Sequence, residues 1–346
     1  MRGALRLHEA GRPANRALVL ALAAGGLVVA SLALLTRCVL QPMPTTHIPR
    51  IGVLESRSSD GAAFQEPLRR ALREQGHVEG QNVIFELPPA RDADTSLDAR
   101  AATLVDAGVD VIVTIGSAAA AAAKAATPRI PIVAVGLTSD PVASGLVASL
   151  GRPGGNLTGV RVDLPELSSK QLELLTEVVP GARRVAVLWN STHPAHPAVL
   201  RQLDATARAL GVELLLLEVR GPDDFAPAFA TAVAQGADAL VTLHDPLTFA
   251  YRDQLLALAA ESRLPAVYEF REWVQAGGLL SYGPSLQDAY HSAGLYVDRI
   301  LRGARPEDLP VEQPTEYELV VNLGTAAALG LALPRALLVD ATDVIP

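Results

Sequence analysis

The sequence is organised around residues 136–159, GLTSDPVASGLVASLGRPGGNLTG. The apolar run 130–137 ends there in a polar corner that closes with Pro141, and a short apolar segment with helical character, 142–150, follows. Pro141 suits the first turn of a helix, and Asp140 just before it can cap the N–H groups of that turn. The pattern predicts a parallel strand whose carboxyl end carries polar side chains to one edge of a sheet. In open α/β sheets, ligands bind at that edge.

Length and composition fit an α/β protein of two domains that does not bind nucleic acid. The chain has 346 residues, few aromatic ones (4%), and enough length for two domains that each bury a core. The formal net charge of the chain is −8. Residues 1–40 contribute +4, so residues 41–346 carry −12. An acidic body without a basic stripe argues against nucleic-acid binding. The one cysteine, Cys38, excludes an internal disulfide framework and a cysteine-based metal site.

The N-terminus has the pattern of a membrane-targeting segment. Four arginines within residues 1–16 precede residues 17–35, which carry no charge and approach the length of a bilayer span. The positive flank predicts that the following chain lies on the periplasmic side of a bacterial inner membrane. Residues 17–35 are either a signal peptide that is removed or an anchor that stays, and the lack of a small-x-small cleavage site favours the anchor. Lipidation at Cys38 is a third possibility, but Arg37 occupies the place of a small residue.

Strands and helices then alternate through two comparable halves. The expected strands are 50–54, 82–87, 109–115 and 130–135, then 184–189, 212–219, 237–243, 265–268 and 278–282. The expected helices are 63–75, 97–107, 118–126, 196–210, 223–234, 249–262 and 286–301. The alternation predicts the α/β class, with two parallel, doubly wound sheets. Their carboxyl edges can face each other across a cleft, a common place for a small ligand.

In the first half, polar residues stand at three expected strand ends. Ser117 opens a helix, where its hydroxyl and the N–H group of Ala118 can bind a carboxylate, or where Ser117 can simply cap the helix. Thr138 and Asp140 belong to the polar corner, and Asp140 can accept from a ligand amine or cap its own turn. Glu55, with Ser56 beside it, holds the matching position after the first strand.

The second half repeats this placement with Asn190, Asp245 and Glu269, each at the end of an expected strand. The amide of Asn190 can contact a ligand directly. Asp140, Asp245 and Glu269 together place three carboxylates at three strand ends. These residues predict a cleft that accepts a positively charged group.

Other chemistry is not indicated. His193 and His196 lie close together but have no third ligand in sequence, which argues against a metal site. The glycine-rich run 151–155 does not follow a strand directly and does not fit a dinucleotide fingerprint, so we expect no cofactor. No nucleophile stands with a base, and we expect no enzymatic activity.

Four motifs in order along the chain carry a resemblance to a known family. They are VEGQNV (78–83), the stretch 138–159, GGLLSYG (277–283), and ELVVNL (318–323) with Ala327, Leu329, Gly330 and Leu331. Together they resemble the ABC transporter substrate-binding protein family that includes tryptophan- and tyrosine-type solute-binding proteins of bacteria. The resemblance covers about residues 48–346.

The resemblance implies a type I periplasmic-binding-protein fold, in which two Rossmann-like lobes are joined by three hinge strands. The chain would cross between the lobes near residues 159–162, 282–284 and 312–317. The implied parts are a signal or anchor segment with its tether, 1–47; an N-terminal lobe, 48–160 plus 284–314; and a C-terminal lobe, 161–283 plus 315–346.

The resemblance also implies a function without catalysis. A monomeric, extracytoplasmic receptor would bind a small polar solute, either an amino acid or a related amine or carboxylate compound, between its lobes. It would pass the solute to a permease subunit in the inner membrane that is served by a separate ATPase subunit. The implied contacts lie near Glu55, Ser117, Asp140, Asn190, Asp245 and Glu269. A membrane-anchored sensing module of the same fold, signalling to a partner, is the alternative.

Overall fold

The computed structural model describes residues 47–55, 61–88, 96–162 and 165–346. Residues 48–346 form a unit of their own. The predicted anchor at 17–35, Cys38 and Ser56 lie outside the described residues. Within the described ranges, no helix is long and apolar enough to cross a membrane.

The first sheet has five strands, all parallel, in the order β2-β1-β3-β4-β5. Its strands are β1 Arg50–Glu55, β2 Ile84–Glu86, β3 Val111–Ile115, β4 Ile132–Leu137 and β5 Leu157–Arg161. Both faces are covered, as a parallel sheet requires. In β3, Ile112 packs in one apolar cluster, whereas its neighbours Val111 and Val113 pack in another. The prediction of a parallel α/β sheet is confirmed here.

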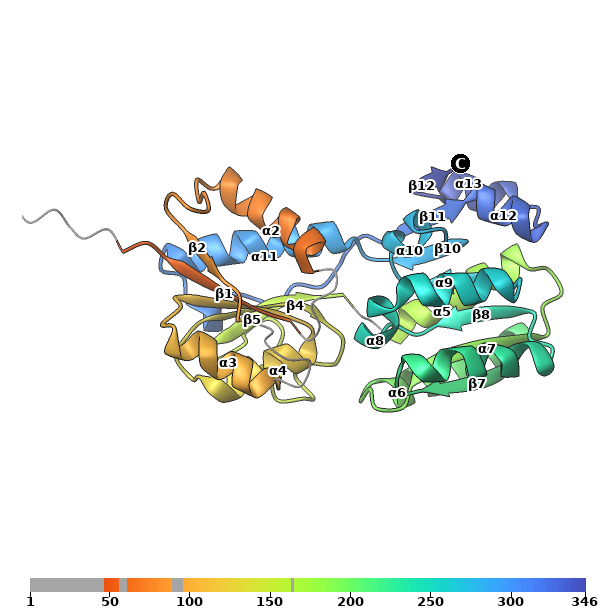
Figure 1. The fold of residues 1–346 in the computed structure, drawn as a ribbon, viewed down its shortest axis with the longest axis horizontal. Helices are drawn as coiled ribbons and strands as arrows, with labels where there is room; N and C mark the ends of the chain where they lie inside the picture. The colour runs from red at the N-terminus through yellow and green to blue at the C-terminus, as the bar shows by residue number, and fades with distance from the viewer. Residues whose placement is uncertain (1–46, 56–60, 89–95, 163–164) are drawn as a thin grey trace, which may run out of the picture. The chain divides into compact units, whose positions relative to one another are not determined.

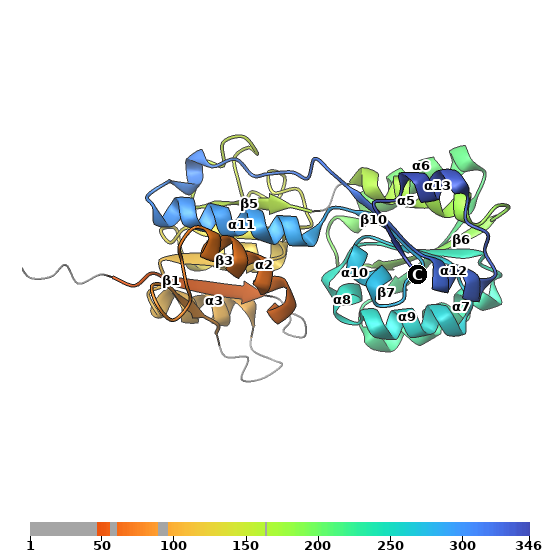
Figure 2. The same cartoon turned by 90° about the horizontal axis from the view of Figure 1, so that it is seen from above.

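Four helices cover this sheet (Figure 1). They are α2 Gly61–Glu74, α3 Leu97–Asp106, α4 Ser117–Ala126 and α11 Leu286–Leu301. Helices α3 and α4 pack against each other on one face, and α2 and α11 on the other. Figure 2 also shows α11 beside α2, although more than 200 residues separate them in sequence. Gly294 allows this approach, because a Cβ atom there would lie 2.6 Å from the Cβ of Ala71.

The second sheet has seven strands in the order β12-β11-β10-β9-β8-β6-β7. They are β6 Arg184–Asn190, β7 Glu213–Val219, β8 Ala239–Thr242, β9 Ala266–Tyr268, β10 Leu280–Gly283, β11 Glu318–Asn322 and β12 Asp343–Ile345. The prediction of an entirely parallel sheet is wrong at one place, because β10 and β11 are antiparallel. Between them the chain passes through α11 on the first sheet and returns from there, so β11 enters the second sheet from the opposite end.

The helices of this half are α5 Pro165–Val178, α6 His196–Leu210, α7 Phe225–Ala234, α8 Pro246–Ala250, α9 Arg252–Glu261, α10 Arg271–Gln275, α12 Leu323–Leu329 and α13 Arg335–Asp340. The side chains of β6 alternate between the two faces of its sheet. Val185 and Val187 pack in the cluster that includes α5 and α6, and Ala186 and Leu188 in the one that includes α7 and α9. Two single 3₁₀ turns, Pro222–Asp224 and Pro306–Asp308, complete the described elements.

Two predicted helices differ from the structure. Residues 142–150 form turns and bends, because the turn after Asp140 ends at Gly145, which has a φ of +73°. The expected helix 249–262 is interrupted at Tyr251, between α8 and α9. Helices α5, α10, α12 and α13 were not predicted.

Three connections join the two sheets. They lead from β5 to α5, from β10 to α11, and from α11 to β11. On the last one, Glu312 accepts from the N–H group of Arg161 and donates to the carbonyl oxygen of Gly159, both in β5. The packing of α11 on the first sheet and the pairing of β11 and β12 in the second support the lobes that we propose, 48–160 plus 284–314 and 161–283 plus 315–346.

Candidate functional site

Ser117 ties together the ends of β3 and β4. It is the first residue of α4, and its Oγ accepts from the N–H groups of Thr138 (3.0 Å) and Ser139 (3.1 Å). Gly116, not Ser117, is the N-cap of α4. The hydroxyl therefore fixes the polar corner after β4, while Ala118 stands exposed in the first turn of α4, where N–H groups have no partner within the helix.

Asp140 caps its own turn. Its Oδ1 accepts from the N–H groups of Val142 (2.8 Å) and Ala143 (3.2 Å), and its side chain is exposed. The sequence allowed Asp140 either to cap its own turn or to accept from a ligand amine, and the structure shows the cap. A contact between Asp140 and a ligand stays a prediction.

Glu55 is a buried carboxylate at the end of β1, 8% exposed. Burial raises the pKa of its carboxyl group above the usual value, and the nearby charge of Arg100 opposes the change. Arg100 also holds this strand end in place, because its guanidinium donates to the carbonyl oxygen of Glu55 at 2.7 Å. Ser56, the next candidate, is outside the described residues.

Asn190 and Asp245 join the ends of β6 and β8. The amide Nδ2 of Asn190 donates to Oδ2 of Asp245 at 3.1 Å, and its Oδ1 accepts from both the N–H and the hydroxyl of Thr192. Oδ1 of Asp245 accepts from the N–H of Leu247 at 2.6 Å and so caps α8. Asp245 is 2% exposed. The structure brings these two candidates together, with their polar atoms engaged in holding the edge of the sheet.

Two histidines complete this cluster. His193 stacks on His196 with ring centroids 4.4 Å apart. Nε2 of His196 faces the carbonyl oxygen of His244 at 3.0 Å and must donate to it, so in the neutral ring Nδ1 accepts from the N–H of Asn190. The prediction that no third metal ligand accompanies the histidines is wrong, because side-chain atoms of His193, His196 and Asp245 lie within 4.8 Å of one another. Both nitrogens of His196 are nevertheless taken, which favours a hydrogen-bonded cluster over a metal centre.

His193 also reaches the other sheet. Its Nε2 lies 3.1 Å from Oγ1 of Thr138, and both side chains are buried. This contact connects Ser117 and Thr138 at the first edge with Asn190 and Asp245 at the second. His193 was considered from the sequence only as a metal ligand. Its position, three residues after the end of β6, was the available signal.

Glu269 follows β9 and is 3% exposed. Its Oε1 lies 3.3 Å from Nδ1 of His244, whereas its Oε2 has no hydrogen-bond partner in the described part of the chain. The side chain borders a small cavity of about 10 Å³, room for roughly one water molecule. The other lining residues are Val162, Leu167, Ser168, Gln171, His244, Phe270 and Pro284.

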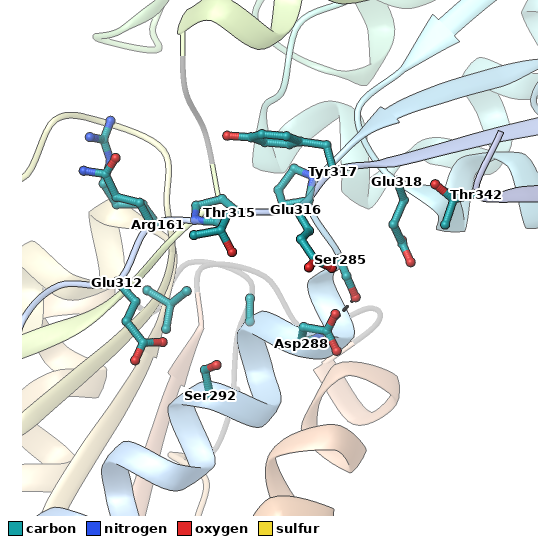
Figure 3. Close-up of a pocket in the computed structure, with 15 residues that line it drawn as sticks. Arg161, Ser285, Asp288, Ser292, Glu312, Thr315, Glu316, Tyr317, Glu318 and Thr342 are labelled. Atoms are coloured by element: carbon teal, nitrogen blue, oxygen red, sulfur yellow. Dashed lines mark hydrogen bonds between the residues drawn. The ribbon is translucent and has the colours of Figure 1, made fainter. Parts of the chain in front are cut away.

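A larger pocket, of about 310 Å³, lies among the three connections (Figure 3). Its lining includes Arg161 at the end of β5, Ser285 between β10 and α11, and Glu312 between α11 and β11, but none of the candidate residues. Glu318 also lines it, and burial raises the pKa of that carboxyl group, against the opposing charge of Arg271. Because the end of β5 and the other two connections border this space, we assign it to the hinge and not to the solute site.

Comparisons with known proteins bear on this arrangement. A family model described as ABC transporter substrate binding protein matches residues 51–345. The chain is 27% identical over 262 residues to a tyrosine-binding protein of Clostridioides difficile, which covers 76% of this chain and 75% of that one.

Two solved structures are also similar to this chain. A conserved domain protein from Vibrio cholerae is 26% identical, with a TM-score of 0.77 over 86% of this chain and 99% of the other. An ABC domain from Streptococcus pneumoniae in complex with L-Trp is 25% identical, with a TM-score of 0.75 and the same coverage.

More distant structures share the fold alone. The leucine-binding protein LivK of Thermotoga maritima (17% identical, TM-score 0.54) and a LacI-family repressor of Corynebacterium glutamicum (16%, 0.55) cover 74% and 79% of the chain, and 83% and 97% of their own. They confirm the predicted two-lobe α/β fold of the type I periplasmic-binding proteins. The family consists of non-enzymatic solute-binding components of transporters. With its matched region spanning both sheets, the chain belongs to the ABC transporter substrate-binding protein family.

Proposed function

We propose that the protein is the extracytoplasmic receptor of an ABC importer and that it binds an amino acid, or a related amine, at the carboxyl ends of its two sheets. The observation that carries the ligand class is the carboxylate of Glu269. One of its oxygens is buried and has no partner among the described residues. A buried charge of this kind is costly unless a donor, best a charged one, is placed against it.

An ammonium group fits this position in charge and in size. The cavity beside Glu269 has room for roughly one water molecule, about the size of an ammonium group. His244 occupies the other oxygen, Oε1, and leaves Oε2 for the solute. The carboxylates of Asp140 and Asp245, in contrast, already accept from N–H groups of their own turns.

The relatives support the amino-acid class. The Clostridioides difficile protein is named for tyrosine and the Streptococcus pneumoniae structure holds L-Trp. In our proposal Ser117, Ala118, Thr138 and Asp140 serve the solute from the first edge, with Glu55 and Ser56 beside them. Asn190, Asp245 and Glu269 serve it from the second. A monomeric receptor would then deliver the solute to a permease that is driven by a separate ATPase subunit, from the periplasmic side of the inner membrane.

The ligand class is tested by calorimetric titration of the full chain with L-tyrosine, L-tryptophan and the other amino acids. For each one that binds, an analogue without the amine and one without the carboxylate are titrated as well. We expect the analogue without the amine to lose most of the affinity, because it leaves Glu269 unpaired. Binding of the amine-free analogue with equal affinity would contradict the proposal.

The role of Glu269 is tested with Glu269→Gln, which keeps the size of the side chain and removes its charge. We expect amino-acid binding to weaken about tenfold to a hundredfold. Glu213→Gln is the matched control, because Glu213 is exposed on β7 and pairs only with Arg184 among the described residues. Its affinity should equal that of the parent protein.

A further inference from the structure

A hydrogen bond between the buried side chains of His193 and Thr138 joins the two sheet edges. Its direction follows from the other ring nitrogen. Nδ1 of His193 lies 3.3 Å from the N–H of Ala195 and accepts from it, so in the neutral ring the proton is on Nε2. Nε2 therefore donates to Oγ1 of Thr138, whose own hydroxyl points toward Oγ of Ser117 at 3.5 Å.

Each partner of this bond also makes contacts within its own lobe. On the second lobe, the ring of His193 lies on His196, and Asn190 and the carbonyl of His244 hold His196 in turn. On the first lobe, the N–H of Thr138 donates to Ser117 and holds the corner in place. Because each partner is held by contacts within its own lobe, the bond depends on the relative position of the two strand ends and breaks when they separate.

We propose that the Thr138–His193 hydrogen bond is a latch, which holds the carboxyl ends of the two sheets together and thereby limits opening of the solute site. The net contribution of one typical hydrogen bond changes the ratio of molecules whose sheet ends are together to molecules whose sheet ends are apart about fivefold. The inference extends the proposed function, but opening of the lobes is measurable without any solute.

The latch is tested with distance measurements between spin labels in the full chain. Cys38→Ser removes the one native cysteine, and Ala121→Cys on α4 and Arg201→Cys on α6 place labels on exposed sites of the two lobes. Thr138→Val, which replaces the hydroxyl group with a methyl group, should lower the ratio of short to long distances about fivefold. Thr138→Ser, which keeps a hydroxyl, should restore the parent distribution.

Thr114→Val is the matched control, because Thr114 is a buried threonine within β3 whose hydroxyl has no partner among the described residues. It should leave the distances unchanged. His193→Phe keeps a stacking ring, and should reproduce the effect of Thr138→Val without adding to it in the double variant. A folded Thr138→Val protein with the parent distribution would overturn the latch.

The same proteins separate the latch from the proposed function. If L-tyrosine, L-tryptophan and the other amino acids fail to bind the parent while Thr138→Val still shifts the distances, the ligand class is wrong and the latch stands. If an amino acid binds but no variant shifts the distances, the latch is wrong and the ligand class stands.

Discussion

Asn190 donates to Asp245 across the ends of β6 and β8, with 3.1 Å between Nδ2 and Oδ2. The same carboxylate caps α8 through Oδ1, and it is 2% exposed. One side chain thus fixes two strand ends and a helix start at the edge where we place the solute. We therefore expect Asp245 to contribute to the shape of the site before it contributes to any contact with the solute.

Asp245→Ala should therefore lower the free energy of unfolding by about 1–3 kcal/mol, because it removes a buried cap and leaves the amide of Asn190 without its acceptor. Urea unfolding of the full chain measures this loss. Asp140→Ala removes a cap that is exposed, and should cost less, about 0.5–1 kcal/mol. An equal, small effect of both substitutions would contradict the assigned contacts of Asp245.

His193 should make stability depend on pH. Burial, and then the charge of His196, lower the pKa of His193 from 6.5 to about 4; His244 adds to this and Asp245 opposes it. Between pH 6.5 and about 4, His193 binds a proton more readily in the unfolded chain than in the folded one. The free energy of unfolding therefore falls as the pH drops through this range. The contribution lost is at most about 3 kcal/mol.

The measurement is the difference in unfolding free energy between the parent and His193→Phe across pH 4–8. Carboxylates that titrate in both proteins cancel in this difference. We expect the parent to lose stability relative to the variant below pH 6.5. A constant difference over the whole range would show that His193 has its ordinary pKa.

Gly294→Ala should destabilise the packing of α11 on α2. The added Cβ would meet the Cβ of Ala71 at 2.6 Å and the carbonyl oxygen of Leu68 at 2.8 Å, which forces the two helices apart. Overpacking of this kind costs about 1–3 kcal/mol in thermal or urea unfolding. Gly151→Ala, where nothing lies within 4 Å of the new atom, is the control. Equal stability of both variants would mean that α11 does not pack closely on α2.

Most strands and helices up to α11 were predictable from the sequence because each carries its own apolar pattern, whereas β5 and α5 were not predicted. Helix 286–301 was predicted with the bounds of α11. The antiparallel entry of β11 was not, since it depends on the chain leaving the second sheet through α11 and returning to it. The turn at 142–150 was mistaken for a helix because its residues are apolar, although Gly145 stops the first turn.

The strand ends that carry the candidate residues could be located from the sequence, but the contacts of those residues could not. Strand ends fix where Ser117 and Asp245 lie, yet the partners of their oxygens depend on the backbone directions of neighbouring turns. His193 shows the limit best, because its partner Thr138 is 55 residues away and on the other sheet. Glu269 was predicted as one carboxylate among several, and only its burial without a partner sets it apart.

The central claim is that an amine-bearing solute pairs with Glu269, and one titration tests it most directly. An amino acid that binds the parent is titrated into Glu269→Gln and into Glu213→Gln under the same conditions. The account predicts a loss of about tenfold or more in the first variant and parent affinity in the second. Unchanged affinity in a folded Glu269→Gln protein would contradict it.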